Sequence, residues 1–456
     1  MMDQQNVVIC GAGIAGISAA YHLAVMHGVQ GILLVDERPP LSLTSDKSTE
    51  CYRNWWPGPG DAMVALMNRS IDLLESLAEK HGNPFHLNRR GYLYLTADEN
   101  SIPGMISNAR DISQLGGGSL RIHGKSAADH SYQPSPAQGF IDGLEGADLI
   151  LNPKIILHHY PFLNDQVAAA LHVRRAGWLS AQQLGSFLLD EARRHGVRLV
   201  RDKITAIEQA GSRVVAVQLE GNQRIPTHHF VAAAGPFLKA LTESFGVELP
   251  VYCELHLKVS AQDRLGIIPR DAPLLIWQDS QKLPWKPPEA AFLGGDPASR
   301  WLLEEFPPGV HIRPEGLSDS PIFLMLWEYH TREIEPTWPL PLDPAYPDIV
   351  LRGLSTMIPD LAQYFEKPPR PFLDGGYYTK TRENRPLIGP LPLEGAWVIG
   401  ALSGFGLMAA MAAGELLALH MLGKSLPRFA GAFQLDRYQD SDYLAQIAEM
   451  DQTGQL

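Results

Sequence analysis

Short apolar runs and a helical pattern alternate at the start of the chain. Residues 6–10 form an apolar run typical of a buried parallel strand, and residues 16–27 place small and apolar side chains at helical spacing. A second apolar run at 31–35 is ended by two prolines. This order predicts a strand–helix–strand unit.

Similar patterns recur later in the chain. Helical spacing predicts further helices over 63–80, 181–195, 348–357 and 406–422. Apolar or alternating runs predict further strands near 91–96, 197–207, 213–219, 228–234 and 396–402. Residues 251–330 alternate strands with Pro-rich loops, whereas 116–150 are rich in Gly, Ser, Pro and Asp, which predicts a long loop.

The dinucleotide-type elements lie at both ends and in the middle of the chain. Because 456 residues exceed one ordinary core, we expect more than one domain. The prediction is an α/β fold with a discontinuous Rossmann-like domain and an inserted mixed-sheet substrate domain. The first comprises residues 1–85, 151–250 and 373–456, and the second comprises residues 86–150 and 251–372.

Composition narrows the class of protein. The net charge of −12 argues against nucleic acid as a partner. The three cysteines are far apart and odd in number, which predicts neither a metal site nor a disulfide framework and favours the cytoplasm. The apolar stretch 396–422 is long enough to span a membrane, but its glycines, Glu415 and His420 favour a strand and a buried helix.

A glycine-rich turn, Gly11–Gly16, joins the first strand to the first helix. Its first glycine permits the tight turn, Gly13 admits a pyrophosphate, and Gly16 lets the helix pack on the strand. The N–H groups of the first helical turn, including those of Ile14 and Ala15, would face the phosphates.

An acid follows at the expected distance. Asp36 lies twenty residues after Gly16, where a carboxylate can accept both ribose hydroxyls. Glu37 is the alternative ribose acid.

A second small-residue segment lies near the other end of the chain. The strand 397–400 leads into Ser403-Gly404-Phe405-Gly406-Leu407-Met408 and then a helix. Small residues let the chain pass close to a flat ring system, and the start of the helix would stabilise the negative charge of a reduced flavin.

Together these segments resemble the D-amino-acid oxidase superfamily of flavoproteins, in its sarcosine oxidase, dimethylglycine dehydrogenase and glycine oxidase branch. The stretches Gly177–Leu179 and Val231–Gly235 are similar to that branch as well. The resemblance implies FAD as the cofactor, bound by the Rossmann-like domain. The cofactor-binding residues predicted from the motifs and the resemblance are Gly11, Gly13, Ile14, Ala15, Gly16, Asp36, Glu37, Ser48, Thr49, Arg53, Ile204, Ala234, Gly235, Gly404, Phe405, Gly406, Leu407 and Met408.

Two departures from that branch carry information. The stretch 375–381 has no cysteine where relatives attach the flavin, so we expect non-covalent FAD. Met408 stands where relatives have a lysine that holds the substrate carboxylate. Tyr378, Lys380, Arg382 and Arg385 are candidates to replace that lysine.

Three further polar residues are candidates for the substrate side. A strand over 323–330 would place Glu328 and His330 on one face, toward the flavin, and His256 is a weaker candidate. The predicted catalytic residues are therefore Tyr378, Arg382, Glu328 and His330, with no metal.

The resemblance implies oxidation of a C–N bond in an amine or amino acid, by hydride transfer to flavin N5 and hydrolysis of the imine. O₂ or another acceptor would reoxidise the flavin, and an assembly of like or unlike subunits stays open. One alternative is a 2-hydroxy-acid (alcohol) dehydrogenase of the same fold, which would need His330 or His256 as base. Another is an electron-transfer subunit of a larger complex.

Overall fold

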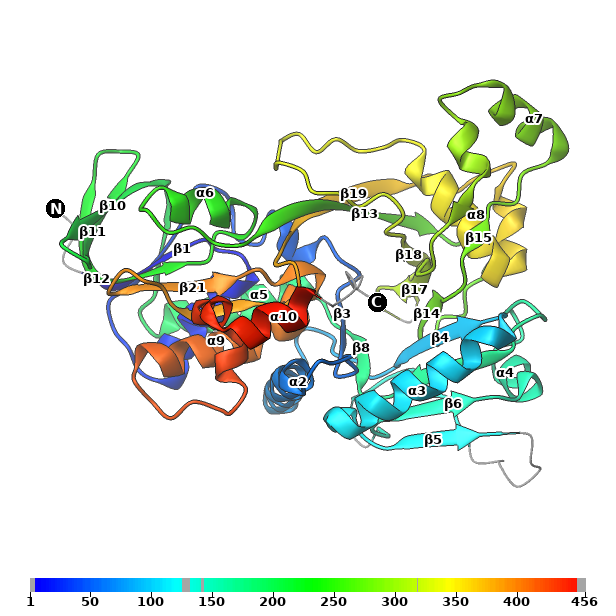
Figure 1. Cartoon of the computed structure of the whole chain (residues 1–456), viewed down its shortest axis with the longest axis horizontal. Helices are drawn as coiled ribbons and strands as arrows, with labels where there is room; N and C mark the ends of the chain where they lie inside the picture. The colour runs from blue at the N-terminus through cyan, green and yellow to red at the C-terminus, as the bar shows by residue number, and fades with distance from the viewer. Residues whose placement is uncertain (1–4, 125–131, 141–142, 318, 449–456) are drawn as a thin grey trace.

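The computed structural model describes residues 5–124, 132–140, 143–317 and 319–448. Two large sheets organise it, one toward each end of the long axis (Figure 1). The long strands β13 and β19 extend from the second sheet toward the first, along one side of the molecule.

The first sheet has eight strands, and its centre is the predicted nucleotide-binding unit. Strand β1 (Gln5–Cys10) pairs in parallel with β2 (Ile32–Asp36) and β12 (Arg224–Ala232), so their carboxyl ends meet at one edge. The remaining strands are β9 (Arg198–Arg201), β10 (Ile204–Ala210), β11 (Arg213–Leu219), β20 (Leu387–Pro390) and β21 (Ala396–Gly400).

Four helices share one apolar core with a face of this sheet. They are α1 (Ile14–Tyr21), α2 (Ala62–His81), α5 (Ala181–Arg194) and α9 (Gly406–Met421). A π-helical turn, His22–Met26, continues α1. A Cβ at Gly16 would lie 2.0 Å from the carbonyl oxygen of Gly11, which shows how closely α1 packs on the turn.

The second sheet has nine strands. In order across the sheet they are β19 (Phe372–Lys380), β13 (Tyr252–Gln262), β18 (Ile322–Leu326), β17 (His311–Glu315), β14 (Leu274–Trp277), β4 (Tyr92–Thr96), β7 (Ala169–Val173), β6 (Ala147–Ile150) and β5 (Leu120–His123). Two pairs are parallel, β4 with β14 and β5 with β6, and the others are antiparallel. The predicted α/β class with a mixed substrate-domain sheet is confirmed.

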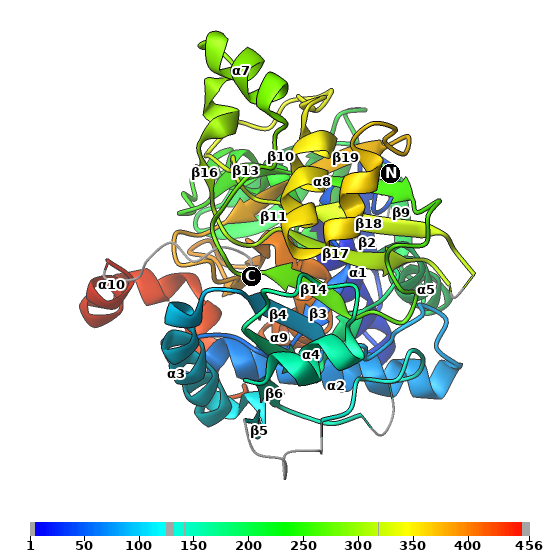
Figure 2. The same cartoon turned by 90° about the vertical axis from the view of Figure 1, so that its right-hand side faces the viewer.

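Helices cover the outer face of the second sheet, as Figure 2 shows from that side. Helices α4 (Pro153–His159) and α8 (Tyr346–Met357) pack their apolar side chains into its core. The other helices are α3 (Ile102–Ile112), α6 (Leu238–Glu243), α7 (Pro287–Gly295) and α10 (Ser441–Ala448). Two small sheets pair β3 (Cys51–Arg53) with β8 (Ala176–Trp178) and β15 (Gln281–Lys282) with β16 (Glu305–Phe306).

Two expectations need correction. The segment 116–150 is not one long loop, because it contains β5 and β6, which pair with each other in the second sheet. Residues 125–131 and 141–142 of this segment lie outside the described residues. The strand expected over 323–330 ends at Leu326, and the chain turns before His330. The domain boundaries stay a prediction. Strand β7 lies in the second sheet, although its residues fall within 151–250, which were assigned to the Rossmann-like domain.

One helix in the described part of the chain, Ser403–Met421, is long and apolar enough to cross a membrane by length and composition alone. Of the 18 consecutive residues that are most apolar in this helix, 67% are buried inside the protein. The helix packs against α1 and α2. A core helix passes the same test, so the absence of a transmembrane segment stays a prediction.

Candidate active site

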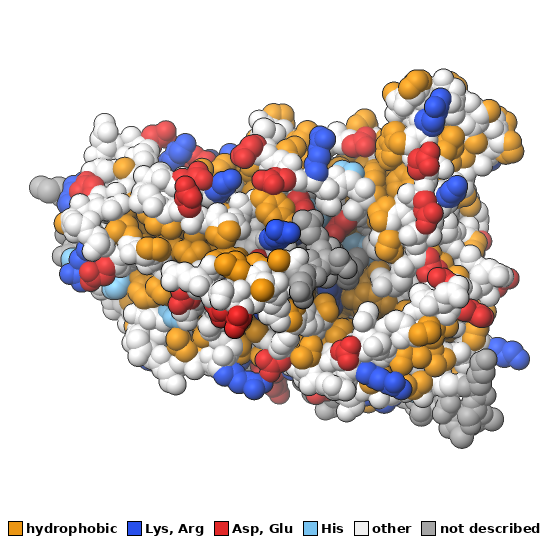
Figure 3. Space-filling model, viewed as in Figure 1, with side chains coloured by type: hydrophobic (Ala, Val, Ile, Leu, Met, Phe, Trp, Pro, Cys, Tyr) orange, Lys and Arg blue, Asp and Glu red, His pale blue; other side chains and the backbone are white. Residues whose placement is uncertain are grey.

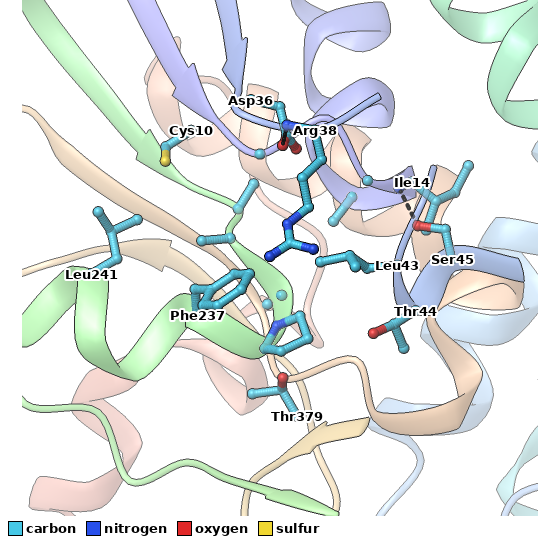
Figure 4. Close-up of a pocket in the computed structure, with 18 of the residues that line it drawn as sticks. Cys10, Ile14, Asp36, Arg38, Leu43, Thr44, Ser45, Phe237, Leu241 and Thr379 are labelled. Atoms are coloured by element: carbon cyan, nitrogen blue, oxygen red, sulfur yellow. Dashed lines mark hydrogen bonds between the residues drawn. The ribbon is translucent and has the colours of Figure 1, made fainter. Parts of the chain in front are cut away.

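The turn after β1 has a backbone that only glycine fits. Gly11 has φ +112°, and a Cβ there would lie 2.3 Å from the carbonyl oxygen of Ala233. The chain then enters α1, where the Ile14 N–H donates to Ser45 Oγ at 3.0 Å (Figure 4). The first turn of α1 therefore faces the segment that follows β2.

A cavity of about 510 Å³ opens at this turn. It lies at the carboxyl ends of β1, β2 and β12, and the first residues of α1 and α9 both line it. Its volume is within the range of small-molecule and cofactor sites. Two helix N-termini bring positive potential to it, which favours an anionic ligand such as a pyrophosphate.

Asp36 is fixed at the edge of this cavity. Its carboxylate accepts hydrogen bonds from the Ala12 N–H at 2.7 Å and from the Arg38 N–H at 2.9 Å. A carboxylate has about four acceptor positions, so it can still accept ribose hydroxyls. Glu37, the alternative acid, also lines the cavity.

The side chain of Arg38 reaches across the cavity, as Figure 4 shows, and sequence reasoning missed it. Its guanidinium carbon lies 4.9 Å from the ring centre of Trp338 and 5.7 Å from that of Phe237. Among the described residues its Nε finds no hydrogen-bond partner, and it lies 3.6 Å from the Glu37 carboxylate. A cation at this position can bind a phosphate. Because Arg38 follows the ribose acid Asp36 by two residues, it could have been predicted from the sequence as a cofactor residue.

Most predicted cofactor residues line the 510 Å³ cavity. They are Gly11, Gly13, Ile14, Ala15, Asp36, Glu37, Ser48, Ile204, Ala234, Gly235, Gly404, Gly406 and Leu407. Gly16 lies behind it, in the packing role expected of it. Four others, Thr49, Arg53, Phe405 and Met408, line a smaller cavity instead.

This small cavity, of about 30 Å³, shares Ser48, Tyr378 and Gly404 with the large one. It therefore continues the cofactor cavity toward the inner face of the second sheet. Two predicted catalytic residues line it, Tyr378 and Glu328. A third cavity, of about 340 Å³, lies beyond Arg38 and is lined by Trp338.

The other two predicted catalytic residues lie elsewhere. Arg382 and His330 are exposed, and neither lines any of these three cavities in the described part of the chain. His330 lies in the turn after β18 and its ring contacts Tyr346, because the strand alternation that would have carried it beside Glu328 ends at Leu326. Arg382 follows the end of β19 at an exposed turn. The geometry lends no support to the roles predicted for them.

A row of buried charges lies behind the small cavity. His256 is fully buried, with Nε2 at 3.1 Å from Glu254 and Nδ1 at 3.1 Å from Glu328. Lys380 Nζ donates to Glu254 at 3.0 Å. The ring of Tyr378 stacks on the imidazole with centres 3.9 Å apart and planes 13° apart.

Strand pairing explains this row. Strands β13 and β19 pair antiparallel with Glu254 opposite Tyr378 and His256 opposite Gly376. A Cβ at Gly376 would lie 2.8 Å from Lys47 Cβ, so the glycine lets the segment that contains Thr44 and Lys47 approach the strand. These partners come from distant parts of the sequence, and no local signal predicts that they meet.

The charges in the row reinforce one another. Burial by itself would lower the pKa of His256, but Glu328 and Glu254 outweigh it and raise that pKa. Burial would raise the pKa of Glu328, yet His256 holds it below its usual value. Burial, and then Glu328, raise the pKa of Tyr378, so its phenol stays protonated. The two carboxylates thus favour the protonated form of His256.

Two other basic side chains of the same sheet face hold the loop that separates the cavities. Lys258 Nζ donates to the carbonyl oxygens of Asp46 and Ser48. Arg313 Nε donates to the carbonyl oxygen of Thr49 at 2.7 Å. The second sheet thereby fixes residues 46–49, of which Ser48 lines both cavities and Thr49 lines the small one.

The remaining candidates for a substrate carboxylate are already engaged. Lys380 pairs with Glu254, and the buried guanidinium of Arg385 donates to the carbonyl oxygen of Pro59. Arg53, predicted as a cofactor residue, is 4% exposed and lines the small cavity, with its guanidinium over the rings of Trp56 and Tyr92.

The large cavity fits FAD. It offers a fixed acid for the ribose, two helix N-termini and Arg38 for the pyrophosphate, and the small-residue turn 403–406 for a flat ring. Cys10 lines it, but burial, with Asp36 and Glu37, raises its pKa to about 12, so its thiol is a poor nucleophile. Among the described residues no group of three or more His, Cys, Asp or Glu is arranged to hold a metal.

Comparison with known proteins agrees with this site. A family model described as FAD dependent oxidoreductase matches residues 6–419. A search of curated proteins found no match.

Solved structures share the fold over almost the whole chain. L-proline dehydrogenase from P. horikoshii is 19% identical, with a TM-score of 0.72 and coverage of 99% of this chain and 100% of that one. Glycine oxidase from Geobacillus kaustophilus is 16% identical, with a TM-score of 0.71 and coverage of 95% and 99%. Iminodiacetate oxidase from Chelativorans sp. BNC1 is 17% identical, with a TM-score of 0.69 and coverage of 94% and 99%.

Proposed function

The chain belongs to the FAD dependent oxidoreductase family, and from that premise we propose that it oxidises a C–N bond of an amine or amino acid. FAD held in the large cavity would supply the acceptor for a hydride from the carbon next to nitrogen. The resulting imine is released to water and hydrolyses. We also propose that FAD is held without a covalent bond and that O₂ or another acceptor removes the electrons.

The carboxylate of Glu328 in the small cavity carries this proposal. The cavity adjoins the cofactor cavity through Tyr378 and Gly404, so a substrate there would lie next to the flavin end of the site. An anion at this point favours a substrate group that is cationic or donates N–H bonds. An amine nitrogen meets that requirement.

The protein's own residues position the substrate and exclude water. Tyr92, Leu326, Phe405 and Met408 give the small cavity an apolar part of its wall, beside the charged Arg53 and Glu328. Tyr378 stands at the junction of the two cavities, and its stacking on His256 fixes its orientation. Such positioning is the main contribution expected of the protein when a cofactor carries the redox chemistry.

Oxidation of a 2-hydroxy acid is less well supported. That reaction needs a base to take the hydroxyl proton. The side chain of His256 has no exposed surface, lines none of the three cavities in the described part of the chain, and lies between Glu254 and Glu328, which raise its pKa. His256 is therefore out of reach of a hydroxyl group in any of these cavities.

An anaerobic screen of the purified, FAD-loaded protein tests the proposal. Amines, amino acids and 2-hydroxy acids are mixed with it in turn, and loss of the oxidised flavin absorbance is recorded. We expect bleaching by members of the first two groups. Bleaching by hydroxy acids alone would show that the substrate class is wrong, and bleaching by none would favour an electron-transfer subunit.

A further inference from the structure

The side chain of Arg38 stands between two cavities. It lines both the large cofactor cavity and the third cavity. In Figure 4 its guanidinium points into the large cavity, next to Phe237. An arginine side chain loses much rotamer freedom when it binds a ligand, so contacts that hold it beforehand strengthen binding. The neighbours of Arg38 therefore matter for the cofactor.

Aromatic rings hold the guanidinium of Arg38. The Glu37 carboxylate, 3.6 Å away, belongs to a side chain that is 40% exposed, and exposed ion pairs of this kind contribute little. The guanidinium carbon lies 4.9 Å from the centre of the Trp338 ring and 5.7 Å from that of Phe237, within the range of cation–π attraction. These two rings stack on each other, with centres 4.9 Å and planes 30° apart.

Trp338 is itself fixed by strands of the second sheet. It lies between β18 and α8 in the sequence. The N–H of the preceding residue, Thr337, donates to the hydroxyl of Tyr377 in β19 at 2.9 Å, and that hydroxyl donates to the Thr337 carbonyl oxygen at 3.0 Å. Slightly earlier, the Ile334 N–H donates to the carbonyl oxygen of Cys253 in β13 at 2.9 Å. The second sheet therefore presents the tryptophan to the cofactor cavity.

Tyr377 also positions the loop that follows β2. Its carbonyl oxygen accepts a hydrogen bond from the Thr44 hydroxyl at 2.9 Å, and its ring meets the Trp338 ring edge-on, with centres 5.3 Å apart. Thr44 precedes Ser45, whose hydroxyl accepts the Ile14 N–H at the start of α1. One buried residue of β19 thus sets both the tryptophan and the loop that faces the first turn of α1.

We propose that Trp338 is a positioning residue for the cofactor, which holds the guanidinium of Arg38 toward the pyrophosphate of FAD and thereby slows the release of FAD. Arg38 supplies charge-assisted hydrogen bonds to the phosphates, and the ring limits the directions in which the guanidinium can turn away. A contact made by the second sheet thus retains a cofactor that lies on the first. This role concerns retention of FAD and is independent of the substrate and of the bond that is oxidised.

The rate of FAD release measures this role without turnover. FAD-loaded wild type, Trp338→Leu, Arg38→Met and the double variant are diluted in a stopped-flow instrument, and the rise in free-flavin fluorescence is recorded. We expect Trp338→Leu to release FAD roughly five- to thirtyfold faster than the wild type, as for loss of a cation–π contact. Arg38→Met should release it at least as fast. The double variant should be no faster than Arg38→Met, because Trp338 acts through Arg38.

Two matched variants separate positioning from packing. Trp338→Phe keeps an aromatic face for the guanidinium, so most of the slow release should return. Trp285→Leu breaks another tryptophan–arginine contact, since the Trp285 ring centre lies 3.9 Å from the Arg352 guanidinium carbon. Trp285 lines none of the three cavities in the described part of the chain, so this variant should release FAD like the wild type.

Tyr377→Phe tests the same contact without touching the tryptophan, in case Trp338→Leu does not fold. It removes the hydroxyl that anchors Thr337 and keeps the carbonyl oxygen that binds Thr44. We expect faster release of FAD here too, and no further increase when the substitution is added to Arg38→Met.

Two results overturn the inference. One is a release rate that stays at the wild-type value in Trp338→Leu, or in Tyr377→Phe if the leucine variant does not fold. The other is a double variant in which the effects of the two single substitutions multiply, because independent effects show that the ring does not act through the arginine. Either result leaves the anaerobic screen, and with it the proposed function, untouched.

Discussion

Asp36 and Arg38 stand two residues apart at the end of β2 and bring opposite charges to one cavity. The backbone N–H groups of Ala12 and Arg38 hold the carboxylate in place before any ligand arrives. On the substrate side, His256 has a comparable role, because its two nitrogens fix Glu254 and Glu328. The backbone thus positions the carboxylate of Asp36, whereas the imidazole of His256 positions the carboxylates of Glu254 and Glu328.

Asp36→Asn tests the ribose contact. The substitution removes the negative charge and one acceptor oxygen, so we expect the dissociation constant for FAD to rise roughly tenfold or more. Fluorescence titration of the apoprotein with FAD measures this. Asp190→Asn, at an exposed position of α5, is the control, and equal affinities in the two variants would remove Asp36 from the site.

The charge on His256 gives a pH-dependent stability. Although burial lowers its pKa, Glu328 and Glu254 raise it above 6.5, so protonation stabilises the folded state. That contribution is complete below the unfolded-state pKa and is lost as the pH rises through the raised folded-state value. We expect the gap in melting temperature between wild type and His256→Gln to be widest near about pH 6 and to narrow toward about pH 9.

The control for that comparison is His158→Gln, an exposed histidine of α4. Its melting temperature should follow the wild type at every pH. A gap for His256→Gln that is constant across this range would show that the imidazolium contributes nothing beyond packing.

At the scale of elements, the starts of α1 and α9 converge on the cofactor cavity from opposite ends of the sequence. Each follows a strand of the first sheet, β1 or β21, through a turn of small residues. Because both strands flank β12, the two helices begin close together. The sheet order thus brings their positive ends to one ligand.

Gly11→Ala tests the first of these turns. The added Cβ would meet the carbonyl oxygen of Ala233 at 2.3 Å, in a backbone conformation with φ +112°. We expect loss of FAD binding and a fall of at least about 1–3 kcal/mol in the free energy of unfolding. Denaturant unfolding measures this, with Gly104→Ala as control, since a Cβ there meets open space. Equal stability of both variants would contradict the geometry.

The nucleotide half of the site was predictable because its signals are local. A strand, the turn Gly11–Gly16, a helix and Asp36 follow one another within one βαβ unit, and the cavity is built on them. The small-residue segment 403–408 is also contiguous, although Phe405 and Met408 face the smaller cavity.

The substrate half was predictable only in part. Tyr378 and Glu328 line the small cavity, but His330 does not, because β18 ends at Leu326 and the alternation of faces does not continue into the turn that contains His330. His256 gained its place from pairing of β13 with β19, more than a hundred residues apart, and strand order across a mixed sheet leaves no local pattern.

At the scale of the whole molecule, the two sheets meet at the loop 46–49. Lys258 and Arg313 of the second sheet hold its carbonyl groups, while Ser45 and Ser48 line the cofactor cavity. The site therefore depends on contact between the sheets.

Figure 3 shows basic and acidic side chains interspersed on one face, without a dense basic patch.

Lys258→Met tests that dependence. Methionine keeps much of the buried length but leaves the carbonyl groups of Asp46 and Ser48 without their donor. We expect FAD to dissociate several times faster, as when one hydrogen bond of about 1 kcal/mol is lost. Stopped-flow release of FAD measures the rate. Lys282→Met, an exposed lysine of β15, should release FAD like the wild type; an unchanged rate in both would disconnect the loop from the cofactor.

We propose that this family member removes hydride from a carbon bonded to nitrogen, and that hydrolysis of the resulting imine then breaks the C–N bond. The most direct measurement is a single anaerobic turnover of the FAD-loaded protein with a substrate that bleaches it, followed by analysis of the released products. We expect one equivalent of ammonia or free amine and one of carbonyl product for each flavin reduced. Full reduction of the flavin with no nitrogen released would contradict it.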